Sequence, residues 1–324
     1  FMIGACLSQG RAQTKSAVSY KNPVVDIAMP DPTVIKAADG YFYVYATEST
    51  RNVPIMKSKD LVEWTYCNTA FTNKTRPRFE PKAGIWAPDI NYINGKYVLY
   101  YAMSVWGGEQ TCGIGVATAN SPQGPFTDHG KMFRSNEIGV QNSIDPSLLQ
   151  YEGRNYLVWG SFRGIYVIEL TADGLSIMSG AKKKRIAGTA FEAVYIHKHG
   201  DYYYMFASIG SCCQGVKSTY KVVVGRSKKV WGPYKDKTGK PMLKNGYSLV
   251  IGANDHFVGN GHGSQIIQDD AGQDWLLYHG FSRSTPENGR ILLLDQIKWD
   301  QEGWPYVEGG SPSYETQKAP VFNN

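Results

Sequence analysis

The sequence predicts an all-β fold, a five-bladed β-propeller, on two observations. First, aromatic residues make up 13% of the chain and charged residues only 19%, with 22 Tyr and 35 Gly, a composition typical of β-sheet proteins. Second, one pattern recurs five times: a polar residue, an apolar strand, a turn containing glycine, and an aromatic strand. The intervals between copies leave room for four strands each, and four-stranded sheets around an axis form a propeller.

The clearest copy lies in the middle of the chain, where Asp145 precedes an apolar strand, Gly153 marks a turn and residues 154–162 return as an aromatic strand. The residues that lead the five copies are Asp31, Asp89, Asp145, Glu192 and His262. Because the innermost strand of a blade starts near the propeller axis, we expect these side chains to converge on one funnel.

Turn residues and segment lengths complete this prediction. Asn94-Gly95 and Asp39-Gly40 predict tight hairpins, because both central residues can take positive φ. Residues 295–307 are expected to supply the last strands, and the sequence leaves open whether the N-terminal segment closes the ring with them. We expect residues 20–324 to form one propeller domain, preceded by residues 1–19 as a signal or lipoprotein remnant or a disordered tail.

The first six residues, Phe-Met-Ile-Gly-Ala-Cys, are too short to span a membrane. They are compatible with the end of a clipped signal peptide, with a lipoprotein processing box that would place a lipid on Cys6, or with an ordinary tail. We therefore expect a protein that is secreted, periplasmic or lipid-anchored at a bacterial cell surface. Membrane contact is expected only through a lipid on Cys6.

Charge and cysteine content exclude several classes of function. The net charge of +6 is mild for this length and no basic face is interleaved with the aromatic residues, so we expect no nucleic-acid partner. The five cysteines show no spacing typical of a zinc site. For the adjacent Cys212 and Cys213, a bridge and two free thiols both remain open. We expect a monomer.

Three of the residues that lead blades are acidic: Asp31, Asp145 and Glu192. Cleavage of a glycosidic bond requires two carboxyl groups across a sugar-sized gap, one protonated and the other ionised. Burial or a nearby like charge raises the pKa of a carboxyl group, and a third carboxylate supplies such a charge. The alternative for Asp31 and Asp145 is that each is a turn or capping residue before proline.

Four motifs, each before a hairpin, resemble the blade-leading motifs of glycoside hydrolase family 43; they are Pro30-Asp31-Pro32, Trp86-Ala87-Pro88-Asp89-Ile90, Ile144-Asp145-Pro146-Ser147 and Phe191-Glu192-Ala193. The resemblance covers nearly the whole chain and implies a five-bladed propeller that cleaves with inversion. It implies that Asp31 is the general base, that Glu192 is the general acid, and that Asp145 raises the pKa of Glu192 and orients it. Asp89 is expected to make a structural hydrogen bond.

Two further segments, 212–227 and 259–264, resemble the arabinanase branch of that family, although Gly263 replaces its usual Asn. In that branch the residue matching His262 lies near the axis and contacts an ion, commonly calcium with waters. A single His is a poor calcium cage on first principles, and the alternative is a hydrogen-bonded core His. No organic cofactor is expected.

Four residues are candidates for substrate binding. Trp86 and Trp106 could stack on sugar rings, the alternative being core packing, and Asn142 and Ser161 could donate hydrogen bonds to sugar hydroxyls. The expected function is an inverting hydrolase that cuts internal α-1,5-L-arabinofuranosidic bonds of arabinan, a side chain of pectin. The alternatives are an exo-acting α-L-arabinofuranosidase or β-xylosidase of the same fold, and a carbohydrate-binding propeller without catalysis.

Overall fold

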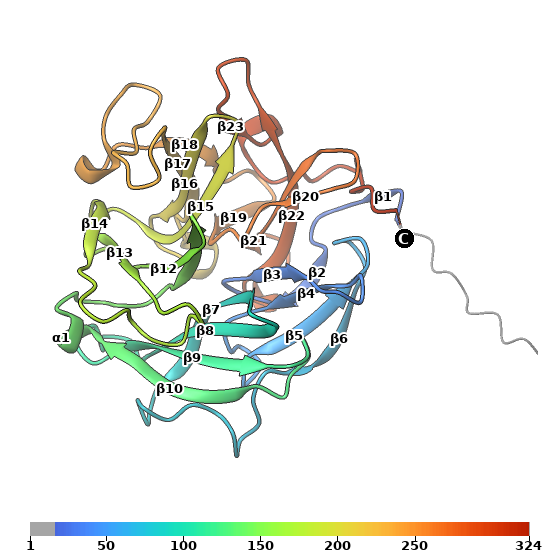
Figure 1. Cartoon of the computed structure of the whole chain (residues 1–324). Helices are drawn as coiled ribbons and strands as arrows, with labels where there is room; N and C mark the ends of the chain where they lie inside the picture. The colour runs from blue at the N-terminus through green and yellow to red at the C-terminus, as the bar shows by residue number, and fades with distance from the viewer. Residues whose placement is uncertain (1–16, 324) are drawn as a thin grey trace, which may run out of the picture.

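The computed structural model describes residues 17–323, and these form five antiparallel sheets arranged in a ring (Figure 1). The prediction of an all-β, five-bladed propeller is thereby confirmed. In each of blades 1 to 4 the four strands are consecutive in the sequence and lie in chain order from the innermost to the outermost strand. No helix within the described part of the chain is long and apolar enough to cross a lipid bilayer.

The first two blades use the N-terminal part of the chain. The strands of blade 1 are β3 (Thr33–Lys36), β4 (Phe42–Tyr45), β5 (Pro54–Ser58) and β6 (Trp64–Thr69). Those of blade 2 are β7 (Gly84–Ile93), β8 (Lys96–Ser104), β9 (Gly113–Ala119) and β10 (Thr127–Arg134), followed by the short helix α1 (Ser135–Ile138).

The next two blades repeat this arrangement. The strands of blade 3 are β11 (Ser147–Tyr151), β12 (Arg154–Trp159), β13 (Ile165–Glu169) and β14 (Lys184–Ala187). Those of blade 4 are β15 (Glu192–His199), β16 (Tyr202–Ile209), β17 (Lys221–Ser227) and β18 (Ser248–Ile251). Single 3₁₀ turns η1 (Gly215–Lys217) and η2 (Met242–Lys244) lie in the connections of blade 4.

Blade 5 joins the two ends of the chain, as its order β19-β21-β22-β2 shows (Figure 1). Its strands are β19 (Phe257–Gly261), β21 (Asp274–Ser282), β22 (Ile291–Trp299) and β2 (Val25–Ala28), with β20 (Ile267–Gln268) on β21 and β23 (Pro305–Tyr306) on β22. Residues 295–307 supply the end of β22 and all of β23, as expected, and the question that the sequence left open is answered, because the outermost strand comes from the N-terminal segment. The 3₁₀ turns η3 (Pro286–Asn288) and η4 (Glu308–Gly310) complete this region.

A second contact joins the ends: β1 (Ser19–Tyr20) pairs with β24 (Gln317–Lys318). The expected tail, residues 1–19, lies almost entirely outside the described residues, and so does Cys6; Ser19 alone is paired in β1. Of the other cysteines, Cys212 and Cys213 form a disulfide with each other, whereas Cys67 and Cys112 are free thiols.

The two predicted tight turns differ. Asn94 and Gly95 have φ of 49° and 80° and connect β7 to β8 directly, as predicted. At Asp39-Gly40 only Gly40 has positive φ, and five residues separate β3 from β4. The Asp39 side chain explains the difference, because its Oδ1 accepts a hydrogen bond from the Tyr41 backbone N–H at 3.0 Å and stabilises a longer turn.

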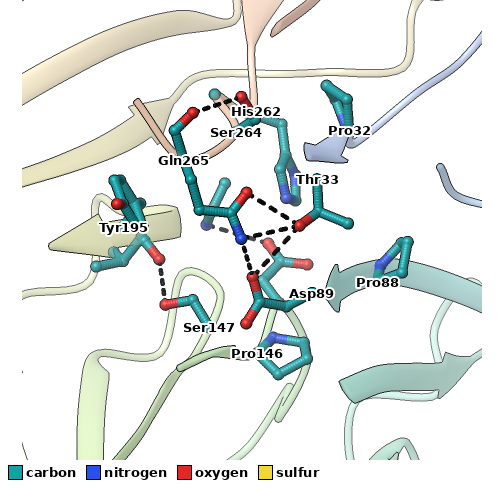
Figure 2. A pocket seen from close by; sticks show the side chains of 14 residues that line it. Pro32, Thr33, Pro88, Asp89, Pro146, Ser147, Tyr195, His262, Ser264 and Gln265 are labelled. Atoms are coloured by element: carbon teal, nitrogen blue, oxygen red, sulfur yellow. Dashed lines mark hydrogen bonds between the residues drawn. The ribbon is translucent and has the colours of Figure 1, made fainter. Parts of the chain in front are cut away.

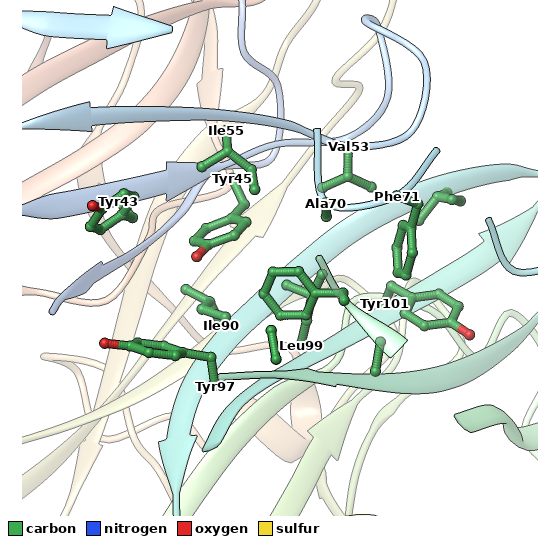
Figure 3. Packing of buried hydrophobic residues seen from close by; sticks show 14 of the residues in the cluster. Tyr43, Tyr45, Val53, Ile55, Ala70, Phe71, Ile90, Tyr97, Leu99 and Tyr101 are labelled. Atoms are coloured by element: carbon green, nitrogen blue, oxygen red, sulfur yellow. The ribbon is translucent and has the colours of Figure 1, made fainter. Parts of the chain in front are cut away.

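The hydrophobic core is divided among the five blade interfaces. The cluster between blades 1 and 2 contains Tyr45 and Ile55 from one sheet and Leu99 and Tyr101 from the other (Figure 3). Corresponding clusters fill the interfaces between blades 2 and 3, 3 and 4, 4 and 5, and 5 and 1. Since each blade buries its two faces against its two neighbours, the blades share their cores and an isolated blade would leave both faces in water.

Candidate active site

One non-glycine residue at the inner edge of each blade adopts the left-handed conformation. These residues are Asp31, Ala87, Asp145, Ala193 and His262, with φ between 42° and 56°. Side chains other than Gly rarely take this conformation, so its recurrence marks one shared backbone geometry. The prediction of five equivalent lead residues is thus right for Asp31, Asp145 and His262, whereas Asp89 lies two residues beyond this position in its blade and Glu192 one residue before it.

The backbone N–H of four of these residues donates a hydrogen bond to a side chain of the preceding blade. The acceptors are Thr47 Oγ1 for Ala87 (2.7 Å), Asp145 Oδ2 for Ala193 (3.1 Å), Ser208 Oγ for His262 (2.9 Å) and His279 Nδ1 for Asp31 (3.0 Å). These bonds fix the height and rotation of neighbouring blades around the axis. They explain why side chains far apart in the sequence meet there.

Asp31 is held as a carboxylate. It is 8% exposed, and its two oxygens accept hydrogen bonds from Arg290 Nη1 at 2.8 Å and from the Thr47 hydroxyl at 2.6 Å. Burial alone would raise the pKa of Asp31, but the positive charge of Arg290, followed by His262, holds that pKa well below its usual range. Asp31 is therefore ionised at neutral pH.

Glu192 is 8% exposed and meets two hydroxyl groups. Tyr220 Oη donates to its Oε1 and Ser161 Oγ donates to its Oε2, both at 2.6 Å. Burial raises the pKa of Glu192, and these two hydrogen bonds oppose the rise without cancelling it. Glu192 is thus better able to carry a proton at neutral pH than an exposed Glu.

Asp145 and Glu192 titrate as a pair. Burial, and after it the Glu192 carboxylate, raises the pKa of Asp145, whose exposure is 7%. Two buried carboxyl groups so close to each other retain a proton between them, because both cannot ionise without mutual repulsion. The Asp31 carboxylate adds to this effect, since its charge raises the pKa of both members of the pair.

A continuous set of contacts joins the three carboxyl groups. The ring of His279, whose Nδ1 accepts from the Asp31 N–H, stacks on the ring of Tyr220 with 5.6 Å between centroids. Tyr220 donates to Glu192, and the next residue, Ala193, donates its backbone N–H to Asp145. One ionised carboxylate beside a pair that retains a proton is the arrangement that general acid–base cleavage of a glycosidic bond needs.

Behind these carboxyl groups lies a small polar cavity on the propeller axis, and Asp89 lines it (Figure 2). Asp89 accepts hydrogen bonds from Gln265 Nε2 at 2.8 Å, from Asn91 Nδ2 at 2.7 Å and from the Leu148 backbone N–H at 2.8 Å. Burial raises the pKa of Asp89 to about 6 despite these donors. The expectation that Asp89 makes a structural hydrogen bond agrees with this arrangement, which joins blades 2, 3 and 5.

His262 lines the same cavity, with its ring directed inward (Figure 2). Its Nδ1 lies 3.2 Å from Asp31 Oδ1, so Nε2 is the nitrogen left for another ligand. Burial alone would lower the pKa of His262, but the charges of Asp31, Asp145 and Glu192 raise it. In its neutral form His262 could bind a cation through Nε2. Because both oxygens of Asp89 already accept hydrogen bonds from protein donors, that cation would take its other ligands from water, and its charge would compensate the buried carboxyl groups.

The two candidate tryptophans lie next to each other, with 5.6 Å between ring centroids and an angle of 51° between the rings. Trp86 belongs to β7 and is half-buried, whereas Trp106, in the loop after β8, is 78% exposed. Because most of the Trp106 indole is exposed to solvent, it contributes little to the hydrophobic core. The pair forms an apolar surface that starts one residue from Ala87, at the inner edge of blade 2.

Ser161 contacts Glu192 directly, and Asn142 contacts it through Ser161. Asn142 Nδ2 donates to Ser161 Oγ at 2.9 Å, and this orients the Ser161 hydroxyl so that its own proton is directed to Glu192 Oε2. The structure therefore gives both residues a role in holding Glu192. Their contact with sugar hydroxyls stays a prediction.

Four residues of this site were not singled out by the sequence analysis: Arg290, His279, Tyr220 and Thr47. Two of them carry a signal that could have been used. Arg290 is a charge directly before the apolar run Ile291–Leu294 of β22, and His279 is a polar residue within the buried strand β21. Their pairing with Asp31 depends on contacts between the two ends of the chain, which no local pattern reveals.

Comparison with known proteins agrees with this geometry. An extracellular exo-α-(1→5)-L-arabinofuranosidase of Cellvibrio japonicus is 36% identical over 306 residues, covering 86% of each chain. An extracellular endo-α-(1→5)-L-arabinanase of Bacillus subtilis is 36% identical over 289 residues, covering 85% of this chain and 86% of the relative.

Among solved structures, an α-L-arabinanase of Cellvibrio cellulosa in complex with arabinohexaose superimposes with a TM-score of 0.80 at 34% identity, covering 89% of this chain and 98% of the other. The profile of glycosyl hydrolases family 43 matches residues 20–305, which include Asp31, Asp145 and Glu192. The chain therefore belongs to glycosyl hydrolases family 43.

Proposed function

We propose that this protein is an endo-acting, inverting arabinanase that cleaves internal α-1,5-L-arabinofuranosidic bonds of arabinan, the side chain of pectin. The observation that carries the proposal is the opposite tuning of Asp31, which Arg290 keeps ionised, and of the Asp145–Glu192 pair, which retains a proton. The relatives named for arabinan support the substrate. Their description as extracellular supports export of this chain as well.

In this mechanism Asp31 is the general base. Its carboxylate removes a proton from a water molecule as the water oxygen attacks the anomeric carbon. Glu192 is the general acid and gives its proton to the glycosidic oxygen as the bond from the anomeric carbon to that oxygen breaks. Attack from the face opposite the leaving group inverts the anomeric configuration, and bulk water afterwards returns the two carboxyl groups to their starting protonation states.

Asp145 shares with Glu192 the proton that the pair retains, and when that proton lies on Glu192 the charge left on Asp145 favours the protonated acid. Ser161 and Tyr220 favour the ionised form that remains after proton transfer, since both donate to Glu192. The acid is therefore balanced between two forms, as a group that must lose and regain a proton in each turnover requires.

The carboxylates are tested by isosteric substitution. We expect Glu192→Gln and Asp31→Asn each to lower kcat on linear arabinan by about 10²–10⁴-fold, because general acid and base groups contribute factors of that size. On an aryl arabinofuranoside, whose leaving group needs no proton, Glu192→Gln is expected to recover most of its rate while Asp31→Asn is not. The exposed Glu315→Gln is the control, and near-normal activity of either variant on arabinan would contradict the assignment.

Arg290 is expected to set the acidic limit of activity. Asp31 must be ionised to act as base, and its pKa is depressed by Arg290, so activity on the acid side is lost only well below neutral pH. Removing that charge in Arg290→Met raises the pKa of Asp31 and moves the acidic limb of the pH profile of kcat/KM to higher pH. The exposed Arg283→Met is the matched control; an unmoved acidic limb in Arg290→Met would mean that another group is the base.

Endo action is supported by the exposed Trp86–Trp106 surface, which offers contact area beyond a single sugar at the carboxyl groups. Trp106→Ala is expected to raise KM for linear arabinan about 2–10-fold, the value of one aromatic contact, and to change KM for arabinobiose little. Tyr66→Ala, at an exposed position on the outer strand β6, is the control. Products of the unmodified enzyme on arabinan are expected to be mixed oligosaccharides.

Two other functions would give different products. Release of arabinose alone from the first minutes of reaction would support the exo-acting alternative. The Cellvibrio japonicus relative is named as such an exo-acting enzyme. Binding of arabino-oligosaccharides without release of reducing sugar would support a binding propeller, a function that would not require three tuned carboxyl groups.

We further propose that the axial cavity binds one hydrated calcium ion, with His262 as its protein ligand and Asp89 and Asp145 compensated by its charge. When bound, the ion supplies electrostatic stabilisation of the axis and leaves proton transfer to the carboxyl groups. Dialysis against a chelator is expected to lower the melting temperature and the activity, and added calcium to restore both. If His262→Gln binds calcium with the same affinity as the unmodified protein, His262 is not the ligand.

A further inference from the structure

A second group of polar side chains lies at the other end of blade 4, away from the catalytic carboxyl groups. His197 and His199 point to the same face of β15 because they are two residues apart on a strand, and Asp274 begins β21 of the next blade. Each offers one ligand atom, and these three atoms all lie within 4.8 Å of one another. Glu192 and His199 are the two ends of β15, about 23 Å apart along an extended strand.

Asp274 is the buried member of this cluster, with 4% exposure. Its Oδ1 accepts a hydrogen bond from Gln268 Nε2 at 3.1 Å and its Oδ2 accepts one from Trp299 Nε1 at 2.8 Å. Within residues 17–323 no Lys or Arg forms an ion pair with it; the ionisable partner within 4 Å is His199, whose Nδ1 lies 3.7 Å from Oδ2. Buried carboxylates are paired or bind metals, and those that bind metals are usually held by such outer hydrogen bonds.

Trp299 positions two members of this cluster. The ring of His199 stacks on Trp299 with 3.7 Å between centroids and 7° between planes, and Trp299 in turn contacts the ring of Tyr204. Trp299 therefore fixes His199 by stacking and Asp274 by its N–H. His197 is half-buried beside His199, with 6.5 Å between the two ring centroids.

We propose that His197, His199 and Asp274 bind a divalent transition-metal ion, with zinc as the best match, and that this ion links blade 4 to blade 5. Two imidazole nitrogens and one carboxylate oxygen suit zinc, whereas calcium and magnesium prefer six or more oxygens or an octahedral shell. Three protein ligands leave the fourth tetrahedral position to water, which the half-buried histidines leave accessible.

The distances agree with an ion-free site that closes on binding. Ligand atoms bonded to zinc at 2.0–2.1 Å are about 3.4 Å apart in a tetrahedron. The separation of 3.7 Å between His199 Nδ1 and Asp274 Oδ2 is close to that value, and a small rotation of the half-buried His197 would bring in the third ligand. Without a metal, the same residues would form only a hydrogen-bonded and stacked contact between the two blades.

The test compares metal binding with thermal stability in the full chain. After dialysis against a chelator, the protein is titrated with zinc, and we expect a 1:1 complex with a melting temperature raised by about 5 °C at 100 times Kd. Calcium is added back after the dialysis and kept constant throughout, so that the axial cavity stays occupied, and neither more calcium nor magnesium should then reproduce the rise. Cobalt should give the visible d–d absorption of a tetrahedral site with nitrogen ligands.

Variants assign the binding to these residues. His199→Gln and Asp274→Asn are expected to weaken zinc binding at least tenfold and to remove the rise in melting temperature and the cobalt spectrum. Both variants are expected to hydrolyse arabinan still. Failure of the metal site and failure of the catalytic proposal are therefore distinguishable, because zinc binding reports on the first and hydrolysis on the second. His256→Gln, at an exposed histidine of blade 5, is the control and keeps the complex.

Unchanged zinc binding in both variants would overturn the proposal, since His262 and the remaining histidines are still present in them. Absence of zinc binding by the unmodified protein would do the same. If the variants unfold, the cobalt spectrum of the unmodified protein decides, because a surface site of one histidine and waters gives a weak octahedral spectrum.

Discussion

The architecture depends on the hydrogen bonds that each blade makes to the next at the axis. In four of the five blades the left-handed residue donates its N–H to a side chain of the preceding blade. That conformation is unfavourable for residues other than glycine, and these bonds, together with packing on both faces of each sheet, stabilise it. The same bonds hold Asp31 and His262 through their backbone N–H groups and Asp145 through its carboxylate.

Support and chemistry therefore use the same atoms. Asp145 accepts the N–H of Ala193 while its charge acts on Glu192, and Thr47 joins Asp31 to Ala87. A small change at one of these contacts alters both the position and the protonation of a reacting group. This dual use explains why the carboxyl groups can be buried yet differ in pKa: Asp31 lies beside Arg290, and the pair Asp145–Glu192 has hydroxyl and backbone donors instead.

Much of this could be predicted from local sequence, and the rest could not for a physical reason. Repeated hairpins and blade-leading acids predict the propeller and the meeting of Asp31, Asp145 and Glu192, because a propeller brings strand starts together. The lead position of Asp89 is misplaced by two residues, since a backbone bulge at Ala87 is invisible in the pattern. Arg290, and the outer strand β2 of blade 5, depend on pairing between distant segments, which periodicity does not reveal.

The closure of blade 5 by β2 also bears on when the protein can fold. Val25 of β2 pairs with Leu292 of β22, so β2 has no partner until a segment far later in the sequence has been made. Until then the fifth sheet lacks an outer strand, blade 1 lacks the neighbour that covers its second face, and a growing chain cannot reach the native state. A polypeptide with this topology can therefore complete its ring only after its fifth blade has been made.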